Sequence, residues 1–390
     1  MPKQTEPPRD TLVRRGRGPD EPGRLVNLPT EQGATMLFNT MAEFEAARAE
    51  RHKPGTQYYG RFSTPSRHAV ETVMAELEGG ADCLATSSGV SAIALALMAS
   101  TAAGREVLIA DNVYHNTRGF ADHVLPQFGV SVRYFDPSIG EGVAALMRPE
   151  TSVVMFEAPG SGTFEVPDIP AIAAAARAGG ALSILDGTWA TPIFCQPLTL
   201  GVDMVVHSGS KYIGGHSDTM IGFVVCSETS AAAARKMALT FGERPGSLDV
   251  TLSLRGLRTL DMRMRHAETA GMEIANWLAL QPQVRRVLHP AFPDCPGHVF
   301  WKRDFSGAAG LFSVILRTED TAKIHAFVDA LALFGIGASW GGFESLVLPV
   351  VPHRTATPWT EPGGILRFGI GNETSESLIE DLAQALPLLG

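Results

Sequence analysis

Between residues 106 and 226, short apolar segments alternate with helical patterns. Segments that are apolar almost throughout are typical of strands buried on both faces, and this alternation favours a mostly parallel sheet with helices on both sides. The predicted strands are Glu106–Ala110, Ser131–Phe135, Ser152–Glu157, Leu182–Asp186, Met204–His207 and Met220–Cys226. The predicted helices among them are Tyr114–Leu125, Gly140–Met147 and Ile169–Ala178. The pattern therefore predicts an α/β fold.

Two further helices are expected before this region. Residues 37–52 predict a short helix with Asn39 or Thr40 as its N-cap. Residues 66–78 predict an amphipathic helix that the following Gly-Gly pair ends. The first 30 residues, which include Gly18 and Pro19, are expected to be extended and loop-like.

The C-terminal part of the chain predicts an α+β arrangement. A single long helix over residues 252–278 is expected to bridge to it. The arginines of that helix, most simply a solvated face, are Arg255, Arg258, Arg263 and Arg265. The strands and helices predicted beyond it are Gly310–Leu316, Ala322–Leu333, Leu366–Gly371 and Ser375–Ala385. A length of 390 residues is long for one core, so we expect two domains.

Composition excludes several classes of protein. Hydrophobic residues make up 45% and charged residues 19% of the chain, a balance typical of soluble globular proteins. A net charge of −9 argues against a nucleic-acid binder. The four cysteines form no C-x-x-C pair and are expected to be small buried side chains in a reducing compartment. With no secretory signal and no apolar run of membrane-spanning length, we expect a cytoplasmic protein without a membrane partner.

One lysine, Lys211, stands directly after an apolar strand and among small and hydroxyl residues, in the run Ser208-Gly-Ser-Lys-Tyr-Ile-Gly-Gly. A lysine that forms a Schiff base needs a partly dry pocket that lowers its pKa and neighbours small enough to admit a planar cofactor. Nearby hydroxyls and backbone N–H groups suit a phosphate. The stretch is compatible with a lysine that carries pyridoxal phosphate (PLP), and equally with a solvated lysine at a strand end.

Polar residues gather where the predicted strands end. In parallel sheets, ligands bind outside the carboxyl ends of the strands, and both Asp186 and the Ser208–Lys211 run follow apolar strands there. A carboxylate at Asp186 could keep a pyridine nitrogen protonated. For an isolated aspartate the simpler interpretation is a cap on the Gly187–Thr188 turn.

Two further segments could bind an anion. Ser87-Ser88-Gly89 opens a helix, where free N–H groups and the helix dipole favour negative charge, although plain N-capping by either serine is common. Tyr59 and Arg61 lie in a polar loop that could reach a phosphate or simply pack on the surface. No G-x-G-x-x-G or G-K-[ST] loop is present, which disfavours dinucleotide and nucleoside-triphosphate binding.

Two single residues have both a functional and a structural interpretation. Tyr114 could stack on a ring or act as an acid or base, but a lone tyrosine is more often a packing residue. Arg367 lies in an otherwise apolar strand, where burial is costly unless the guanidinium meets a carboxylate. That carboxylate could belong to a substrate or to a structural Asp or Glu.

Together these motifs resemble the Cys/Met-metabolism family of PLP enzymes, with the β-lyases most similar. The resemblance covers nearly the whole chain. The motifs that carry it are Tyr59-Gly-Arg61, Glu76-Leu-Glu-Gly-Gly80, Ser88-Gly89, Glu157-Ala-Pro-Gly160, Asp186-Gly-Thr-Trp-Ala190, Ser210-Lys-Tyr-Ile-Gly-Gly-His-Ser-Asp218, Ser253-Leu-Arg-Gly-Leu-Arg-Thr-Leu260 and Ser339-Trp-Gly-Gly-Phe-Glu-Ser345. The resemblance implies a fold of the aspartate-aminotransferase type (fold type I), with a mostly parallel large domain and a smaller α+β domain at the C-terminus.

The resemblance also implies a role for each matching residue. Lys211 would bind PLP covalently and shuttle protons, Asp186 would pair with the pyridine nitrogen, and Tyr114 would stack on the ring and take part in catalysis. The residues implied for the phosphate are Gly89, Val90, Ser208 and Ser210, with Tyr59 and Arg61 reaching the phosphate of a neighbouring subunit. The residues implied for the substrate are Ser339 and Arg367, which would hold the α-carboxylate, and Trp340, which would line the pocket. No metal site is predicted.

The implied domains are an N-terminal arm (1–60) that contacts a neighbouring subunit, a PLP-binding large domain (61–258) and a C-terminal α+β domain (259–390). The implied assembly is a homotetramer made of two active dimers. The implied reaction is β-elimination of L-cystathionine to homocysteine, pyruvate and ammonia, in methionine biosynthesis.

Other activities remain open. A γ-lyase, a γ-synthase or a cysteine or cystine desulfhydrase could use the same scaffold; Trp340 favours a β-lyase, and Asn116 stands where methionine γ-lyases carry a reactive cysteine. A non-catalytic PLP-binding protein and an NAD-type oxidoreductase are less compatible with the motifs. Two departures from the family pattern are Phe62, where many β-lyases have a second arginine, and Gly187, where asparagine is usual.

Overall fold

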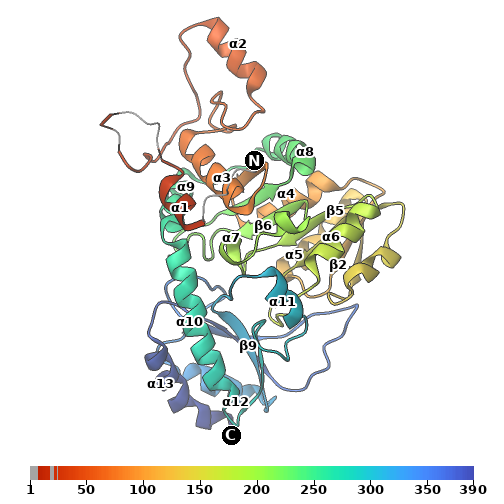
Figure 1. Cartoon of the computed structure of the whole chain (residues 1–390), viewed down its shortest axis with the longest axis vertical. Coiled ribbons are helices and arrows are strands. Elements are labelled where there is room, and N and C mark those ends of the chain that lie inside the picture. The colour runs from red at the N-terminus through yellow and green to blue at the C-terminus, as the bar shows by residue number, and fades with distance from the viewer. Residues whose placement is uncertain (1–7, 18–21, 24) are drawn as a thin grey trace.

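Two sheets built from different parts of the chain organise the computed structural model, which describes residues 8–17, 22–23 and 25–390 (Figure 1). The first sheet has the strand order β1-β7-β6-β5-β4-β2-β3. Its strands are β1 (Asp82–Thr86), β2 (Glu106–Ala110), β3 (Ser131–Phe135), β4 (Thr151–Glu157), β5 (Leu182–Asp186), β6 (Met204–Ser208) and β7 (Gly222–Cys226). Only β7 runs antiparallel to its neighbours. The predicted mostly parallel α/β sheet is confirmed.

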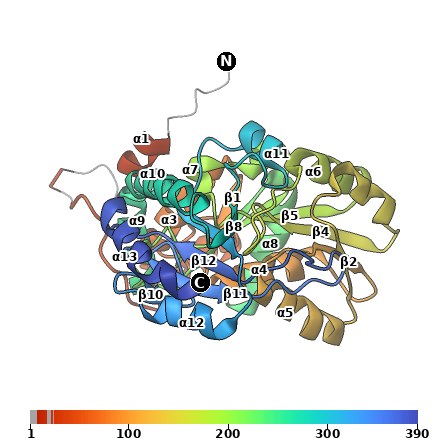
Figure 2. The ribbon, with the colours of Figure 1, turned by 90° about the horizontal axis from the view of Figure 1, so that it is seen from below.

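Helices cover both faces of this sheet, with α6 on one side and α4 and α5 on the other (Figure 2). The α-helices of this part are α3 (Pro65–Glu78), α4 (Gly89–Ser100), α5 (His115–His123), α6 (Ile169–Ala178), α7 (Thr191–Phe194), α8 (Glu228–Phe241) and α9 (Ser247–Arg258). The short 3-10 helices are η1 (Leu125–Phe128), η2 (Gly140–Leu146) and η3 (Pro197–Leu200). The helix predicted over residues 140–147 is thus a 3-10 helix. The Gly-Gly pair ends α3 as expected, because Gly79 adopts the left-handed conformation with φ 71°.

The second sheet has the order β10-β11-β12-β9-β8. Its strands are β8 (Val284–Leu288), β9 (Leu311–Leu316), β10 (Gly335–Ile336), β11 (Leu346–Val350) and β12 (Ile365–Gly369). The helices of this part are α10 (Leu260–Ala279), α11 (His298–Asp304), α12 (Thr321–Asp329), α13 (Ser375–Ala385) and η4 (Leu386–Leu389). The predicted α+β arrangement is confirmed.

The long helix predicted over residues 252–278 is wrong in one respect, because the chain breaks at Thr259 into α9 and α10. The arginine face is also only partly solvated. Arg263 donates to the carbonyl oxygens of Tyr212 (2.5 Å) and Gly256 (2.8 Å). Arg258 donates to the carbonyl oxygen of Leu12 at 2.5 Å. These backbone acceptors satisfy guanidinium groups that the sequence pattern assigns to water.

Helix α10 bridges two hydrophobic cores. Leu260 and Met264 pack in the core of the first sheet, whereas Ile274 and Leu278 pack in that of the second. The two cores agree with a two-domain organisation, while the exact division at residues 60 and 258 stays a prediction.

The N-terminal region contains α1 (Pro8–Arg14), which the sequence pattern missed, and α2 (Met41–Glu50). The loop predicted around Gly18 and Pro19 lies outside the described residues. Thr40 caps α2 as one of the two expected residues. None of the residues of α2 is buried, and the helix stands away from the rest of the chain (Figure 1). Across the described ranges, no helix combines the length and apolar character needed to cross a membrane.

Candidate active site

A cavity of about 840 Å³ opens between the two sheets, at the carboxyl ends of β4, β5 and β6. Its lining includes ten of the twelve predicted site residues: Gly89, Val90, Tyr114, Asp186, Ser208, Ser210, Lys211, Ser339, Trp340 and Arg367. Their convergence follows from the topology, because parallel strands end at one edge of the sheet. Tyr59 and Arg61 are not among the lining residues.

Lys211 lies in the turn after β6, and its Nζ donates to Ser339 Oγ at 2.7 Å. The Nζ atom is 5.5 Å from the centre of the Trp340 ring. Burial, together with the positive charge of Arg367, lowers the pKa of Lys211 to about 8. This is the partly dry environment expected of a nucleophilic amine, and it disagrees with the alternative of a solvated lysine.

Asp186 is both a turn cap and a cavity residue. Its Oδ1 accepts from the backbone N–H of Thr188 at 3.0 Å and from Thr188 Oγ1 at 2.5 Å. Thr188 Oγ1 in turn accepts from the backbone N–H of Ser208 at 2.9 Å, so one hydroxyl links Asp186 to the Ser208–Lys211 turn. Burial raises the pKa of Asp186, and the bonds from Thr188 and the charge of His207 oppose that shift. A cation bound beside this carboxylate would compensate for its buried charge.

Glu157 is a cavity residue to which the sequence assigned no role. It ends β4 directly beside Asp186 on β5, so the two carboxyl groups lie on one face of the sheet. Its Oε2 accepts from the backbone N–H of Tyr114 at 2.6 Å. Burial and the nearby charge of Asp186 raise the pKa of Glu157 well above its usual range. The sequence signal for Glu157 is its place at the end of an apolar strand, because ligands bind at that edge of a parallel sheet.

Arg367 supports the functional interpretation. Its Nη2 donates to the carbonyl oxygen of Ser339 at 3.2 Å. Among the described residues no Asp or Glu is within ion-pair distance, and burial lowers the pKa of Arg367. A guanidinium in this position is satisfied by an anion from outside the chain, such as a substrate carboxylate.

The turn that opens α4 provides an anion-binding cradle. Ser88 caps the helix by accepting from the N–H of Ser91 at 3.1 Å, so the capping interpretation is correct. Gly89 lies against β6, where an added Cβ would come within 2.7 Å of Ser208 Oγ. The turn therefore combines close backbone approach with helix-terminal N–H groups, which suits a phosphate group. With Lys211 and Asp186 at the other side of the cavity, the residues present fit PLP.

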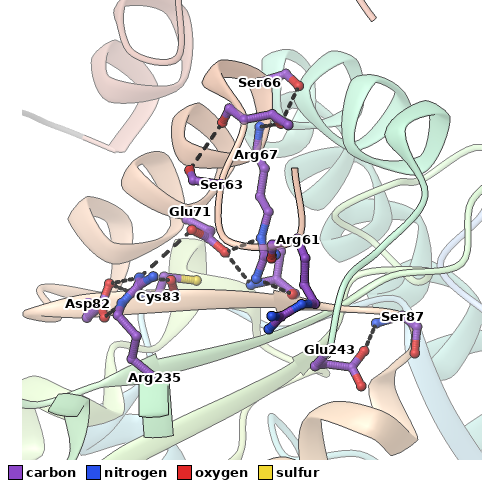
Figure 3. Close-up of polar contacts among 12 residues, drawn as sticks. Arg61, Ser63, Ser66, Arg67, Glu71, Asp82, Cys83, Ser87, Arg235 and Glu243 are labelled. Atoms are coloured by element: carbon purple, nitrogen blue, oxygen red, sulfur yellow. Dashed lines mark hydrogen bonds and ion pairs between the residues drawn. The ribbon is translucent and has the colours of Figure 1, made fainter. Parts of the chain in front are cut away.

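Buried ion pairs support this turn from behind, as Figure 3 shows. Arg67 bonds Glu71 at 2.8 Å, and the same Glu71 Oε1 accepts from the N–H of Ala85 in β1 at 3.0 Å. Arg235 binds Asp82, at the other end of β1, through 2.6 and 2.5 Å bonds. The strand that ends at the anion turn is thus fixed by two arginines, and no cavity residue takes part in the pairs.

Tyr59 and Arg61 lie at the base of the arm. Arg61 donates to the carbonyl oxygen of Leu239, and its guanidinium lies 4.5 Å from the centre of the Phe62 ring. Phe62 also packs against Tyr58, with 5.5 Å between ring centres. Phe62 therefore belongs to an aromatic cluster where the arm joins the large domain, and a role for Tyr59 and Arg61 at a phosphate stays a prediction that needs a second subunit.

The glycine at position 187 has a packing reason. An added Cβ there would lie 3.0 Å from both His207 Cε1 and Val205 Cγ1. His207 is buried and bonds Glu78 at 2.6 Å, so it has little freedom to move aside. A larger residue at 187 would require the His207 ring to shift.

Covalent uptake of PLP by the apoenzyme is expected to follow the ionisation of Lys211. Because the neutral amine is the nucleophile, the uptake rate should rise as the pH passes through about 8. Arg367→Met should move this midpoint upward, because it removes a positive charge near the amine; Arg317→Met, on the exposed end of the same sheet, is the matched control. Stopped-flow absorbance of added PLP measures the rate. A midpoint near the ordinary lysine pKa of about 10.4 would contradict the environment described here.

Comparisons with known proteins show which family the chain resembles. The family model for the Cys/Met metabolism PLP-dependent enzymes matches residues 10–387. A putative cystathionine beta-lyase of Rhizobium johnstonii is 40% identical over 95% of this chain and 93% of its own length. Cystathionine beta-lyase MetC of Escherichia coli is 36% identical over 95% of this chain and 96% of its own. The crystal structure of metB from Corynebacterium glutamicum superposes with a TM-score of 0.89 at 29% identity, covering 99% of both chains.

Proposed function

The chain belongs to the Cys/Met metabolism family of PLP-dependent enzymes, and we propose that it is a carbon–sulfur lyase that cleaves L-cystathionine by β-elimination. The observation that carries the proposal is the meeting of Lys211, Asp186 and Arg367 in one cavity. It joins a nucleophilic amine, a buried carboxylate and a guanidinium that has no carboxylate partner among the described residues. The relatives named cystathionine beta-lyase give the reaction its specific form.

Each residue of the cavity has a separate role. Arg367 and Ser339 bind the substrate α-carboxylate, and Trp340 closes the wall beside Lys211. Asp186 would hold the protonated pyridine nitrogen of PLP, and PLP, when bound, would withdraw electrons from Cα. The turn at Gly89 and Val90 holds the phosphate together with Ser208 and Ser210.

Lys211 moves the protons. The free, neutral amine of Lys211 takes the Cα proton, and a pKa of about 8 suits this role near neutral pH. The electron pair of the Cα–H bond forms the Cα–Cβ double bond, and the pair of the Cβ–S bond leaves with sulfur. Lys211 or Tyr114 protonates that sulfur, so homocysteine departs. Water then hydrolyses the remaining three-carbon enamine to pyruvate and ammonia.

The products of L-cystathionine decide the reaction. Purified holoenzyme should release pyruvate and homocysteine, identified by mass. Release of 2-oxobutyrate and cysteine would move the function to γ-elimination. Faster turnover of L-cystine or L-cysteine than of L-cystathionine would make the chain a desulfhydrase. A protein that binds PLP but turns over none of these substrates would contradict the proposal.

The active unit that we propose is a dimer, assembled in pairs into a homotetramer. The support is the exposed arm: α2 buries none of its residues, and Leu37 is 94% exposed. Tyr59 and Arg61 would complete the phosphate site of the neighbouring subunit. The four cysteines are all free and buried, which suits a reducing cytoplasm and a role in methionine biosynthesis.

Mixing two inactive variants tests the shared site. Arg61→Ala and Lys211→Ala should each lose activity, because each damages every site in its own oligomer. After subunit exchange, mixed dimers should contain one intact site, built from the arm of the Lys211→Ala subunit and the cavity of the Arg61→Ala subunit. Activity should therefore return on mixing. If Arg61 acts only within its own chain, mixing leaves the activity at the level of the separate variants.

A further inference from the structure

Tyr114 is held at both ends. Its backbone N–H donates to Glu157 Oε2 at 2.6 Å, and its hydroxyl oxygen accepts from Asn116 Nδ2 at 2.7 Å. Glu157 is anchored at the end of β4, whereas Asn116 lies in the first turn of α5, two residues after Tyr114. The first contact fixes the backbone of Tyr114, and the second fixes the position of its hydroxyl group.

The second contact determines what the hydroxyl can do. A phenol has one hydrogen to donate and two lone pairs, whereas a carboxamide NH₂ group can only donate. With Asn116 donating to one lone pair, the phenol hydrogen remains available to another acceptor. Tyr114 lines the cavity, and the cationic groups facing it there, Arg367 and Lys211, are donors when charged. No described residue accepts this hydrogen, although the carboxylates of Glu157 and Asp186 also line the cavity, so a molecule bound there can accept it.

We propose that Asn116 is a positioning residue that holds the Tyr114 hydroxyl as a proton donor to the departing sulfur. This inference rests on the proposed function for the identity of the acceptor. When the Cβ–S bond breaks, its electron pair stays on sulfur and the phenol proton moves to it. The thiol leaves, and the phenolate that remains keeps the Asn116 N–H bond until water returns a proton. The step involves no oxidation or reduction.

The surroundings of Tyr114 explain why its hydroxyl needs the hydrogen bond from Asn116. Burial raises the pKa of Tyr114, and the charges of Glu157 and Asp186 raise it further. The Asn116 bond and the charge of Arg367 act in the opposite direction. Other titratable groups near it are His115, whose ring centre is 4.4 Å away, Lys211 across the cavity, and Arg118, Asp122 and His123 further along α5. Since a donated N–H stabilises phenolate more than phenol, Asn116 makes Tyr114 a stronger acid.

The experiment titrates Tyr114 directly, without substrate. The chain has five tyrosines, and the difference between the ultraviolet titration of the holoenzyme and that of its Tyr114→Phe variant isolates Tyr114. Asn116→Ala should raise the Tyr114 midpoint by about one pH unit, as expected for loss of a hydrogen bond to a charged group. Asn116→Asp should raise it further, because a carboxylate accepts the phenol proton and repels phenolate. Asn116→Gln keeps the amide and should restore part of the shift.

Opposite results overturn the inference. If the amide oxygen of Asn116 accepted the phenol proton instead, Asn116→Ala would lower the midpoint. An unchanged midpoint would show that the contact has no influence on the hydroxyl. Asn372→Ala, on an exposed residue, controls for the loss of an amide, and cofactor absorbance confirms that each variant retains PLP.

Activity gives a separate readout. In Asn116→Ala, kcat for L-cystathionine should fall about 10-fold, and its alkaline limb should move with the Tyr114 midpoint. If the titration shifts but the protein cleaves no thioether, the proposed function fails while the positioning role stands. If cleavage is normal and its pH profile is unaffected by Asn116→Ala, the positioning role fails while the lyase stands.

Discussion

Replacing Lys211 with alanine is expected to lower turnover of L-cystathionine by roughly 10⁴-fold, because one side chain supplies both the nucleophile and the base. Burial and the positive charge of Arg367 lower the pKa of this amine to about 8, so part of it is neutral near neutral pH. A methyl group in place of the aminobutyl side chain removes both the amine that would link to PLP and the acceptor for the Cα proton. Pyruvate release under saturating PLP measures the loss.

A second lysine variant shows whether the loss is specific to Lys211. Lys302→Ala removes an exposed lysine of α11 and should leave turnover within about twofold of the wild type, as expected for a surface substitution. Lys211→Ala should still bind PLP without the covalent link, since Asp186 and the turn at Gly89 remain. A Lys211→Ala protein with full activity would refute the mechanism.

The sequence predicted the first sheet well for a physical reason. Strands such as β2 and β5 are short, mostly apolar and buried at nearly every residue. Such segments have one stable environment, between two layers of helices, so their pattern allows few other arrangements. Helix α6, which Asp168 caps and whose apolar residues face the sheet, was likewise predicted within its observed bounds.

Elements that depend on distant partners were harder to predict. No glycine or proline stands at Thr259, and one acceptor of Arg263, the carbonyl oxygen of Tyr212, lies 51 residues away in the sequence. Strand β10 has only two residues, paired to β11, and no periodicity can reveal so short a segment. Both features come from tertiary contacts that local patterns do not contain.

The same distinction applies to the site. Lys211 and Asp186 could be placed together because both follow apolar strands that end at one edge. The link between them through Thr188, and the hydrogen bond that the Tyr114 N–H donates to Glu157, depend on tertiary structure that the sequence pattern does not contain. Arg61 points to a third limit, because the role that we propose for it lies in a neighbouring subunit, and its contacts to Leu239 and Phe62 within the chain do not reveal that role.

Asp186→Asn is expected to change cofactor affinity and apoenzyme stability in opposite directions. Asparagine has the same shape, and its amide oxygen can still accept from Thr188. The buried charge is lost, however, so the pyridine nitrogen loses its anionic partner. Turnover should fall roughly 100- to 1000-fold, as for other losses of a preorganised charge, and PLP should dissociate more readily during dialysis.

The apoenzyme should respond the other way. A carboxyl whose pKa is raised by burial makes the folded state less stable at every pH above its unfolded-state pKa, because the charge must be held in a dry site. At neutral pH, Asp186→Asn removes that cost, so the Tm of the apoenzyme should rise while that of the PLP-loaded protein falls. Asp218→Asn, an exposed aspartate seven residues after Lys211, should change neither. General damage to the fold would lower both Tm values, and an Asp186 that serves only as a turn cap would leave PLP affinity unchanged.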